Sequence, residues 1–161
     1  MDLITVRQLF KDTAAYAGKE IEVGGWVRNR RPSKQFGFIV LNDGTYFTPV
    51  QVVYNDTLAN FQEISKINIG AALIIKGVLV ETPDSKQPFE IQASEITVEG
   101  PSTGDYPLQP KRHTMEFLRT ITHLRPRTNT FQAVFRVRSL AAMAIHKFFQ
   151  DRDFVYVHTP L

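Results

Sequence analysis

Five segments of alternating apolar and polar residues, with one short helical pattern among them, constrain this chain more than any other feature. The segments are 20–31, 36–43, 46–54, 71–82 and 88–100, and the helical pattern follows Asp56. A period of two indicates strands that bury one face. Three strands, a helix and two strands match the five-stranded OB-fold barrel, whose helix lies between strands three and four. Another small barrel or half of a β-sandwich remains an alternative.

Glycine, aspartate and threonine predict where these elements begin and end. Asp43-Gly44 predicts the hairpin between the second and third strands. Gly24-Gly25, inside the first strand, predicts a bulge or a sharp coil. Asp56 is expected to cap a helix over "TLANFQEISKI". An amphipathic helix is predicted over 5–18, with Thr5 as its N-cap and Gly18 just past its end.

The composition changes after residue 99. "GPSTGDYPLQPKR" (100–112) carries three prolines and two glycines, which is typical of a linker. A short helix is predicted over 114–125 and a long one over 127–152, capped by Thr128 or Thr130. We therefore divide the chain into a barrel domain at 1–99, a hinge at 100–125, and a helix-and-strand segment at 126–161.

The last residues, "FVYVHTPL" (154–161), form an apolar pattern that predicts a strand closed by Pro160. Terminal segments are usually polar and frayed unless something ties them down. We therefore expect this segment to be the beginning of a further domain of a longer protein.

Composition excludes several classes of function. The chain has no cysteine, which removes disulfides, thiolate nucleophiles and cysteine-bound metals and fits a reducing cytoplasm. No stretch approaches the roughly 18 apolar residues of a membrane helix. The four histidines show no metal-ligand spacing, and there is no phosphate-binding loop or nucleophile elbow. We expect a cytoplasmic chain with no membrane partner, no metal site and no catalytic residue of its own.

The segment "GWVRNRRPSKQFGFIVLNDG" (25–44) combines the features of a single-stranded nucleic-acid site. Strands two and three of an OB-fold carry that site. Cations attract phosphates, and an aromatic side chain such as Phe38, with Phe36 beside it, stacks unpaired bases. Gln51 on strand three and Glu90 on strand five can hydrogen-bond base edges. The cations are Arg28, Arg30, Arg31 and Lys34.

The same residues also permit structural interpretations. A basic cluster at a strand end is often a solvated hairpin tip, and Gln51 between two valines can simply face solvent. The net charge of +3 permits a polyanionic partner without requiring one. Cations, an aromatic and an amide on one predicted face favour nucleic acid.

Several segments resemble a known family. "GWVRNRR", "FGFIVLNDG", "PVQVVY" and "FEIQAS" are similar to the N-terminal anticodon-binding domain of the class II aspartyl-, asparaginyl- and lysyl-tRNA synthetases. "KRHTMEFLRTITHLRPRTN" resembles, more narrowly, the hinge of bacterial-type asparaginyl-tRNA synthetases; the aspartyl enzymes have a different phrase at "HLRPRTN". The resemblance covers essentially the whole chain.

The resemblance implies roles for individual residues. Phe38 matches the aromatic that stacks on the central anticodon uridine, and Gln51 matches the glutamine that hydrogen-bonds the same base. Arg31 matches an arginine on the rim of strand one that contacts the anticodon, with the two preceding arginines as its neighbours. Glu90 matches a strand-five glutamate near the first anticodon base.

The end of the chain resembles motif 1 of class II catalytic domains, a long helix and a strand that build a homodimer interface. The resemblance covers 131–161, with Pro160 as the motif proline. Phe148 and Phe149 are the expected interface aromatics. Asp153 departs from the family, which has glycine before the aromatic that starts the strand. If that position is left-handed, aspartate tolerates it less well than glycine.

The resemblance implies a full-length enzyme with an α+β class II catalytic domain that joins asparagine to tRNA(Asn) through an aminoacyl-adenylate. ATP and Mg²⁺ would serve that enzyme and are not expected on this portion, which lacks motifs 2 and 3. We expect this portion to bind the tRNA(Asn) anticodon, to form homodimers through motif 1, and not to aminoacylate alone. A stand-alone OB-fold module for single-stranded RNA or DNA and a non-discriminating aspartyl-type synthetase are the alternatives.

Overall fold

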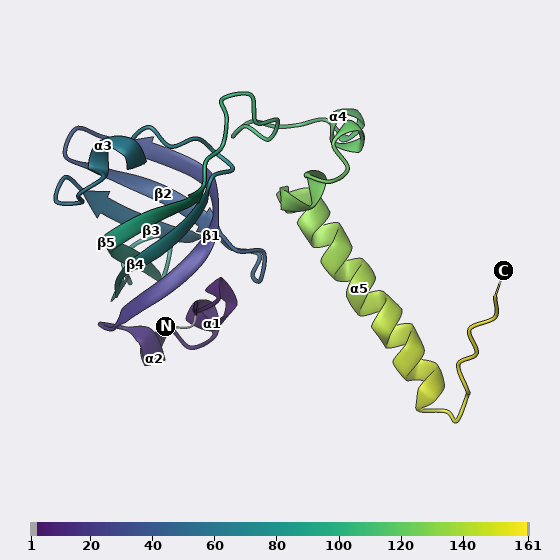
Figure 1. Cartoon of the computed structure of the whole chain (residues 1–161). Helices are drawn as coiled ribbons and strands as arrows, with labels where there is room; N and C mark the ends of the chain where they lie inside the picture. The colour runs from purple at the N-terminus through teal and green to yellow at the C-terminus, as the bar shows by residue number, and fades with distance from the viewer. Residues whose placement is uncertain (1–2, 161) are drawn as a thin grey trace. The chain divides into compact units, whose positions relative to one another are not determined.

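The structure is a computed structural model that describes residues 3–160, so the outermost ends of the predicted segments 1–99 and 126–161 lie outside the described residues. The chain divides into two compact units, Met1–Arg112 and His113–Leu161. Every described strand belongs to the first unit, and the second is helical (Figure 1). No helix within the described part of the chain is both long and apolar enough to cross a membrane.

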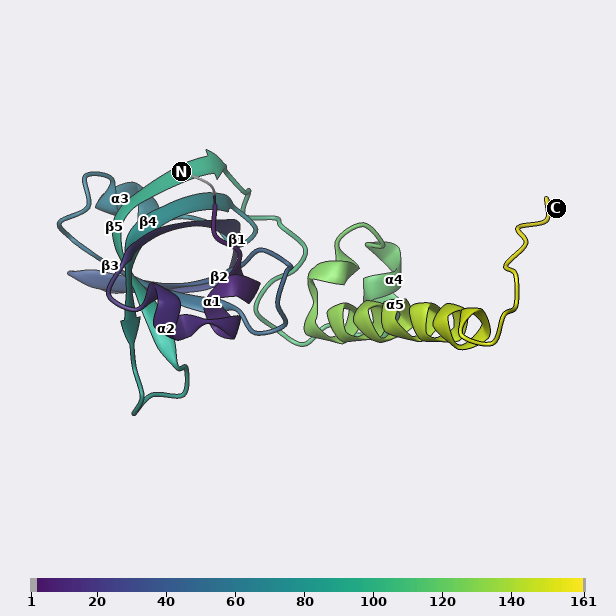
Figure 2. The ribbon, with the colours of Figure 1, turned by 90° about the horizontal axis from the view of Figure 1, so that it is seen from below.

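The first unit is built around a closed five-stranded barrel (Figure 2). Its strands are β1 (Glu20–Pro32), β2 (Phe36–Asn42), β3 (Val50–Asn55), β4 (Ala72–Glu81) and β5 (Phe89–Gly100). They follow the order β1-β2-β3-β5-β4, and neighbours are antiparallel except β3 and β5. The parallel pairing of Val52 with Ile91 closes the barrel. The predicted five-stranded OB-fold barrel, with a helix between strands three and four, is confirmed.

Alternate side chains of all five strands form one apolar core, as the period of two predicts. Burying an aliphatic side chain of this size contributes about 1.5–3 kcal/mol relative to leaving it exposed. Fully buried examples, one from each strand, are Val23, Ile39, Val52, Ile75 and Ile91.

Two short helices, α1 (Val6–Lys11) and α2 (Thr13–Tyr16), stand where one helix over 5–18 is predicted. Thr5 caps α1 as expected, and Gln8 completes a capping box. Asp12 leaves the helical conformation, with φ −142° and ψ 59°, and this break makes the single-helix prediction wrong. In both views α1 and α2 lie at one end of the barrel (Figures 1 and 2).

Helix α3 (Phe61–Ile64) lies at the other end of the barrel and is shorter than predicted (Figure 1). Its N-cap is Asn60, so the prediction that Asp56 caps it is wrong. The Asn60 amide instead donates to the Ile96 carbonyl oxygen at 2.9 Å, which ties the start of α3 to β5. The predicted apolar face is nevertheless buried: Leu58, Phe61, Ile64 and Ile67.

The hairpin at Asp43-Gly44 is longer than predicted, because β3 begins at Val50 and not at residue 46. The Asp43 carboxylate holds this loop in place. It accepts hydrogen bonds from the backbone N–H of Val6 at 2.8 Å and of Thr45 at 2.9 Å. The loop is thereby held against the first turn of α1, and pairing of β2 with β3 begins at Leu41 and Val50.

The linker after β5 packs on the barrel over its first part. The ring of Tyr106 covers Gly70, where an added Cβ would lie 2.9 Å from ring atoms and φ is +88°. The Asn68 amide donates to the Ser102 carbonyl oxygen at 2.8 Å. These contacts keep the chain near the barrel through residue 106.

The second unit contains α4 (Met115–Thr120), a 3₁₀ turn η1 (Arg125–Arg127) and α5 (Asn129–Gln150). Thr128 caps α5 through its hydroxyl oxygen, as predicted. The Arg125 guanidinium lies 4.7 Å from the centroid of the Phe131 ring, a cation–π contact that fixes η1 to the start of α5. Further along α5 these apolar side chains are exposed: Val137, Leu140, Met143, Ile145, Phe148 and Phe149.

Residues 154–160 have no regular secondary structure, so the prediction of a strand there is wrong for this structure. A strand needs hydrogen bonds from a neighbouring strand. Every described strand lies in the barrel of the first unit, and none pairs with this segment.

Helix α5 ends in a complete Schellman motif. The Phe154 N–H donates to the Phe149 carbonyl oxygen at 3.2 Å, and the Asp153 N–H donates to the Gln150 carbonyl oxygen at 3.2 Å. The rings of Phe149 and Phe154 are in contact, 5.3 Å apart. Asp153 has φ +61°, the left-handed conformation that this motif requires and that usually selects glycine.

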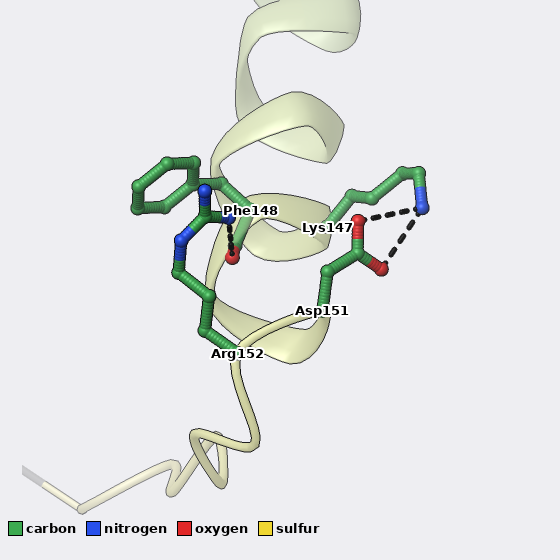
Figure 3. Close-up of polar contacts among 4 residues, drawn as sticks. All are labelled: Lys147, Phe148, Asp151 and Arg152. Carbon is green, nitrogen blue, oxygen red and sulfur yellow. Dashed lines mark hydrogen bonds and ion pairs between the residues drawn. The ribbon is translucent and has the colours of Figure 1, made fainter.

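Side chains around this turn also hold the helix end (Figure 3). The ammonium group of Lys147 lies 2.8 Å from the Asp151 carboxylate, and the Arg152 guanidinium donates to the Phe148 carbonyl oxygen at 3.0 Å. The same guanidinium lies 3.8 Å from the centroid of the Phe148 ring. Lys147 in the last turn and Arg152 just beyond the helix are thus two cations at the C-terminus of α5, where the helix dipole favours them.

Asp153→Gly is expected to stabilise the end of α5 by about 1 kcal/mol, because glycine adopts positive φ without a Cβ penalty and removes a negative charge from the helix C-terminus. Amide hydrogen exchange at Phe154 should slow about fivefold. Asp153→Ala is the matched control, since it removes the charge and keeps the strain. Equal protection in the two variants would show that backbone strain is not the cause.

Candidate nucleic-acid interface

Gly37 determines which way the aromatic side chains of β2 face. It is buried, and a Cβ added there would collide with the hydroxyl and ring of Tyr54 on β3. The Tyr54 ring therefore lies directly beneath the backbone of β2. Since side chains alternate along a strand, Phe36 and Phe38 both project from the opposite, outer face.

Pairing between strands arranges two rows of side chains on this outer face, because directly opposed residues share one face of a sheet. The first row is Arg31, Phe38, Val53 and Gln92. The second row is Asn29, Val40 and Gln51. The structure thus brings a cation, an aromatic and an amide onto adjacent rows of three strands.

The aromatic part of this face is partly exposed. Phe36 has 45% of its surface exposed and Phe38 is half-buried. Their rings meet edge to face, with centroids 5.6 Å apart and planes at 87°. The Arg31 guanidinium lies 5.9 Å from the centroid of the Phe38 ring. A flat ring with a cation beside it can accept a stacked base and its phosphate together.

Gln51 and Glu90 form a polar pair at the edge of the same face. Nε2 of Gln51 donates to Oε2 of Glu90, 3.3 Å away, and both side chains are half-buried. The bond links β3 to β5 across the parallel junction that closes the barrel. It leaves Oε1 of Gln51 as an acceptor for another molecule.

The three predicted arginines of β1 do not lie together. Arg31 lies on the outer face, whereas Arg30 pairs with buried Ile39 and donates to the Ser65 carbonyl oxygen at 2.7 Å, at the end of α3. Arg28 is the extra residue of a register shift between Val27 and Asn29, and it is half-buried. The prediction of a bulge at Gly24-Gly25 is wrong, because both glycines pair in regular register with β4 and the bulge lies at Arg28.

The sequence analysis missed Asn29, which lies in the row of Gln51. Its Oδ1 accepts a hydrogen bond from the Arg30 N–H at 2.9 Å. Asn29 shares its sequence parity with buried Val27, so alternation alone assigns it to the interior. Only the register shift moves it to the outer face.

The other predicted positions lie in the second unit. Phe148 and Phe149 on α5 are 51% and 45% exposed, and Pro160 is exposed in the segment without regular structure. Leu161 lies outside the described residues. Among residues 3–160 no group of three or more histidine and acidic side chains could hold a metal ion.

Comparison with known proteins agrees with this geometry. Residues 21–99 match the family model of the OB-fold nucleic acid binding domain of the tRNA anticodon type. The chain is 59% identical over 161 residues to an asparagine–tRNA ligase of Desulfitobacterium hafniense and 62% identical over 162 residues to one of Acetivibrio thermocellus. All of the chain is covered in each case, but only 35% of the relative. The chain thus spans about a third of the curated relatives it matches.

Solved structures share the fold. The chain is similar to asparaginyl-tRNA synthetase from Pyrococcus horikoshii complexed with asparaginyl-adenylate, with a TM-score of 0.86 and 19% identity over 99% of this chain and 37% of that one. It is similar to aspartyl-tRNA synthetase from Entamoeba histolytica, with a TM-score of 0.80 and 19% identity over 99% of this chain and 39% of that one. At such identities the likeness establishes the fold.

Gly37→Ala is expected to destabilise the barrel by about 1–3 kcal/mol, because the added methyl group overlaps the Tyr54 ring and hydroxyl. Urea denaturation followed by tryptophan fluorescence measures the loss. Tyr54→Phe is the companion variant: the Tyr54 hydroxyl is buried without a hydrogen-bond partner, so its removal is expected to cost little or to stabilise. Full stability of Gly37→Ala would mean that this contact does not orient β2.

Proposed function

We propose that this chain, whose residues 21–99 belong to the OB-fold nucleic acid binding family, is the anticodon-binding front part of an asparagine–tRNA ligase. The observation that carries the proposal is the outer row of Arg31, Phe38 and the neighbouring Gln51 on the barrel of a chain about 60% identical to such ligases. Single-stranded nucleic acid on OB-folds lies on this face of strands two and three.

The full-length enzyme would activate asparagine with ATP and Mg²⁺ and transfer it to tRNA(Asn) in the cytoplasm. That chemistry belongs to a class II catalytic domain of which this chain would hold motif 1. The residues described here would bind and select the tRNA through the outer face of β2 and β3.

Recognition of the anticodon would divide among the outer-face residues. The Phe38 ring would stack on the central uridine, and the amide of Gln51 would hydrogen-bond its edge. Arg31 would contact a phosphate next to that base. Glu90, whose side chain accepts a hydrogen bond from Gln51, would lie near the first anticodon base, which is next to the central one.

Helix α5 and the segment after it would form the homodimer interface of motif 1. The exposed apolar side chains of α5, which include Phe148 and Phe149, are the surface to be covered. The left-handed turn at Asp153 would direct the chain toward a strand that ends at Pro160. A pairing strand from the catalytic domain would supply the hydrogen bonds that 154–160 lack here.

Phe38→Ala is expected to weaken binding of a tRNA(Asn) anticodon hairpin by about 1–3 kcal/mol, because a stacking platform is lost. Fluorescence anisotropy with labelled hairpin measures the Kd. Phe47→Ala is the control, since it removes another solvent-accessible phenylalanine, 45% exposed, that lies in the β2–β3 loop and off the face of β2. Unchanged affinity in a folded Phe38→Ala variant would contradict the proposed interface.

Arg31→Gln is expected to reduce the salt dependence of hairpin binding. Each phosphate contact on single-stranded RNA contributes about 0.7 to the slope of log K against log salt concentration. Titrations at several salt concentrations should show a slope shallower by about that amount. Arg7→Gln, an exposed arginine on α1, should leave the slope unchanged. An unaltered slope for Arg31→Gln would place this side chain away from the phosphates.

A further inference from the structure

Glu90 places a negative charge on a face proposed to bind RNA, where it repels phosphates. Within residues 3–160 no lysine or arginine is recorded in an ion pair with it. Its hydrogen bond is the one from Nε2 of Gln51, at 3.3 Å. The function of this carboxylate is therefore to be sought in what it does to Gln51.

The contact fixes the orientation of the Gln51 amide. An ionised carboxylate offers acceptors only, whereas an amide offers an oxygen that accepts and a nitrogen that donates. Beside Glu90 the nitrogen must face the carboxylate, and Oε1 is directed away from it. Within the described residues no donor occupies that oxygen. An amide without such a neighbour can rotate by half a turn and exchange the two atoms at little cost.

This orientation matters for the choice between the two pyrimidines. Uracil and cytosine have the same ring size, so stacking on Phe38 does not separate them. They differ at N3, which carries a hydrogen in uracil and a lone pair in cytosine. A fixed amide oxygen accepts a hydrogen bond from N3–H of uracil and is repelled by the lone pair of cytosine. A rotated amide would instead donate to N3 of cytosine and accept from its amino group.

We propose that Glu90 is a specificity-determining positioning residue: it holds the Gln51 amide in the orientation that accepts uracil and rejects cytosine at the base stacked on Phe38. The inference rests on the proposed function, because it presumes that this base is the central uridine of the anticodon. Glu90 acts here through Gln51. Its substitution should therefore change the ratio of the affinities for uridine and cytidine RNA, whereas a change of charge alone would change the two affinities equally.

The test uses the chain with two RNA hairpins that differ only in the central loop base, uridine or cytidine. Glu90→Gln keeps the size of the side chain but lets it donate as well as accept. Glu90→Asp keeps the charge but withdraws the carboxylate by one methylene. Glu95→Gln is the matched control: it makes the same charge change on β5, and Glu95 is exposed and pairs with Lys76 of β4.

The measured quantity is the ratio of the two Kd values. The unsubstituted chain and Glu95→Gln are expected to prefer the uridine hairpin by about 10- to 100-fold, because the fixed Oε1 of Gln51 accepts from N3–H of uracil and is repelled by the lone pair of cytosine. In Glu90→Gln and Glu90→Asp the ratio should fall to within about threefold of unity, chiefly because the cytidine hairpin binds more tightly. A full preference retained by both Glu90 variants would overturn the inference.

Failure of the inference can be told from failure of the proposed function. If the unsubstituted chain binds both hairpins equally, the proposed anticodon interface is wrong, and the inference fails with it. If the unsubstituted chain prefers uridine and the Glu90 variants do too, only the inference fails. Urea denaturation confirms that each variant is folded, and a loss of folding in Glu90→Gln leaves Glu90→Asp to decide.

Discussion

The register shift between Val27 and Asn29 is the constraint on which the proposed nucleic-acid face depends. The backbone N–H of Val27 donates to the Ala71 carbonyl oxygen at 2.9 Å, and the Val27 carbonyl oxygen accepts from the Gly70 N–H at 2.8 Å. These bonds hold β1 to the start of β4 while its next residues pair with β2. One extra residue, Arg28, absorbs the transition, and every later side chain of β1 changes sides.

That change of sides explains how far the site could be predicted from the sequence. The sequence identifies the face by its residue types, cations followed by aromatics and an amide. Placing the aromatics and the amide on one face requires only the alternation of side chains in β2 and β3. Alternation continued from Val27 would send Arg31 inward and Arg30 outward, the reverse of what the structure contains. A bulge is decided by hydrogen bonds to a strand more than 40 residues away, which local pattern does not encode.

In the fold, too, features that depend on neighbouring residues could be predicted, and features that depend on distant strands could not. Caps at Thr5 and Thr128 are local chemistry, a hydroxyl beside a free N–H, and both could be predicted. The barrel order follows from five alternating segments and one helix. The strand predicted after α5 needs a partner, so its sequence pattern alone cannot produce it. Asp153 lies between these two cases. Its left-handed φ is set by the Schellman hydrogen bonds at the end of α5, and the sequence shows only that a residue less suited than glycine stands at this position.

The charges of the barrel face determine what kind of binding it can provide. Arg31 on the outer row and exposed Lys34 in the turn before β2 are few cations for a polyanion, and Glu90 opposes them. Sequence-independent attraction is therefore small, and stacking at about 1–3 kcal/mol per base with hydrogen bonds to base edges must supply most of the free energy. Such an interface discriminates between bases better than it holds RNA. This agrees with the proposed function, in which the domain would check an anticodon while other parts of a larger enzyme would hold the rest of the tRNA.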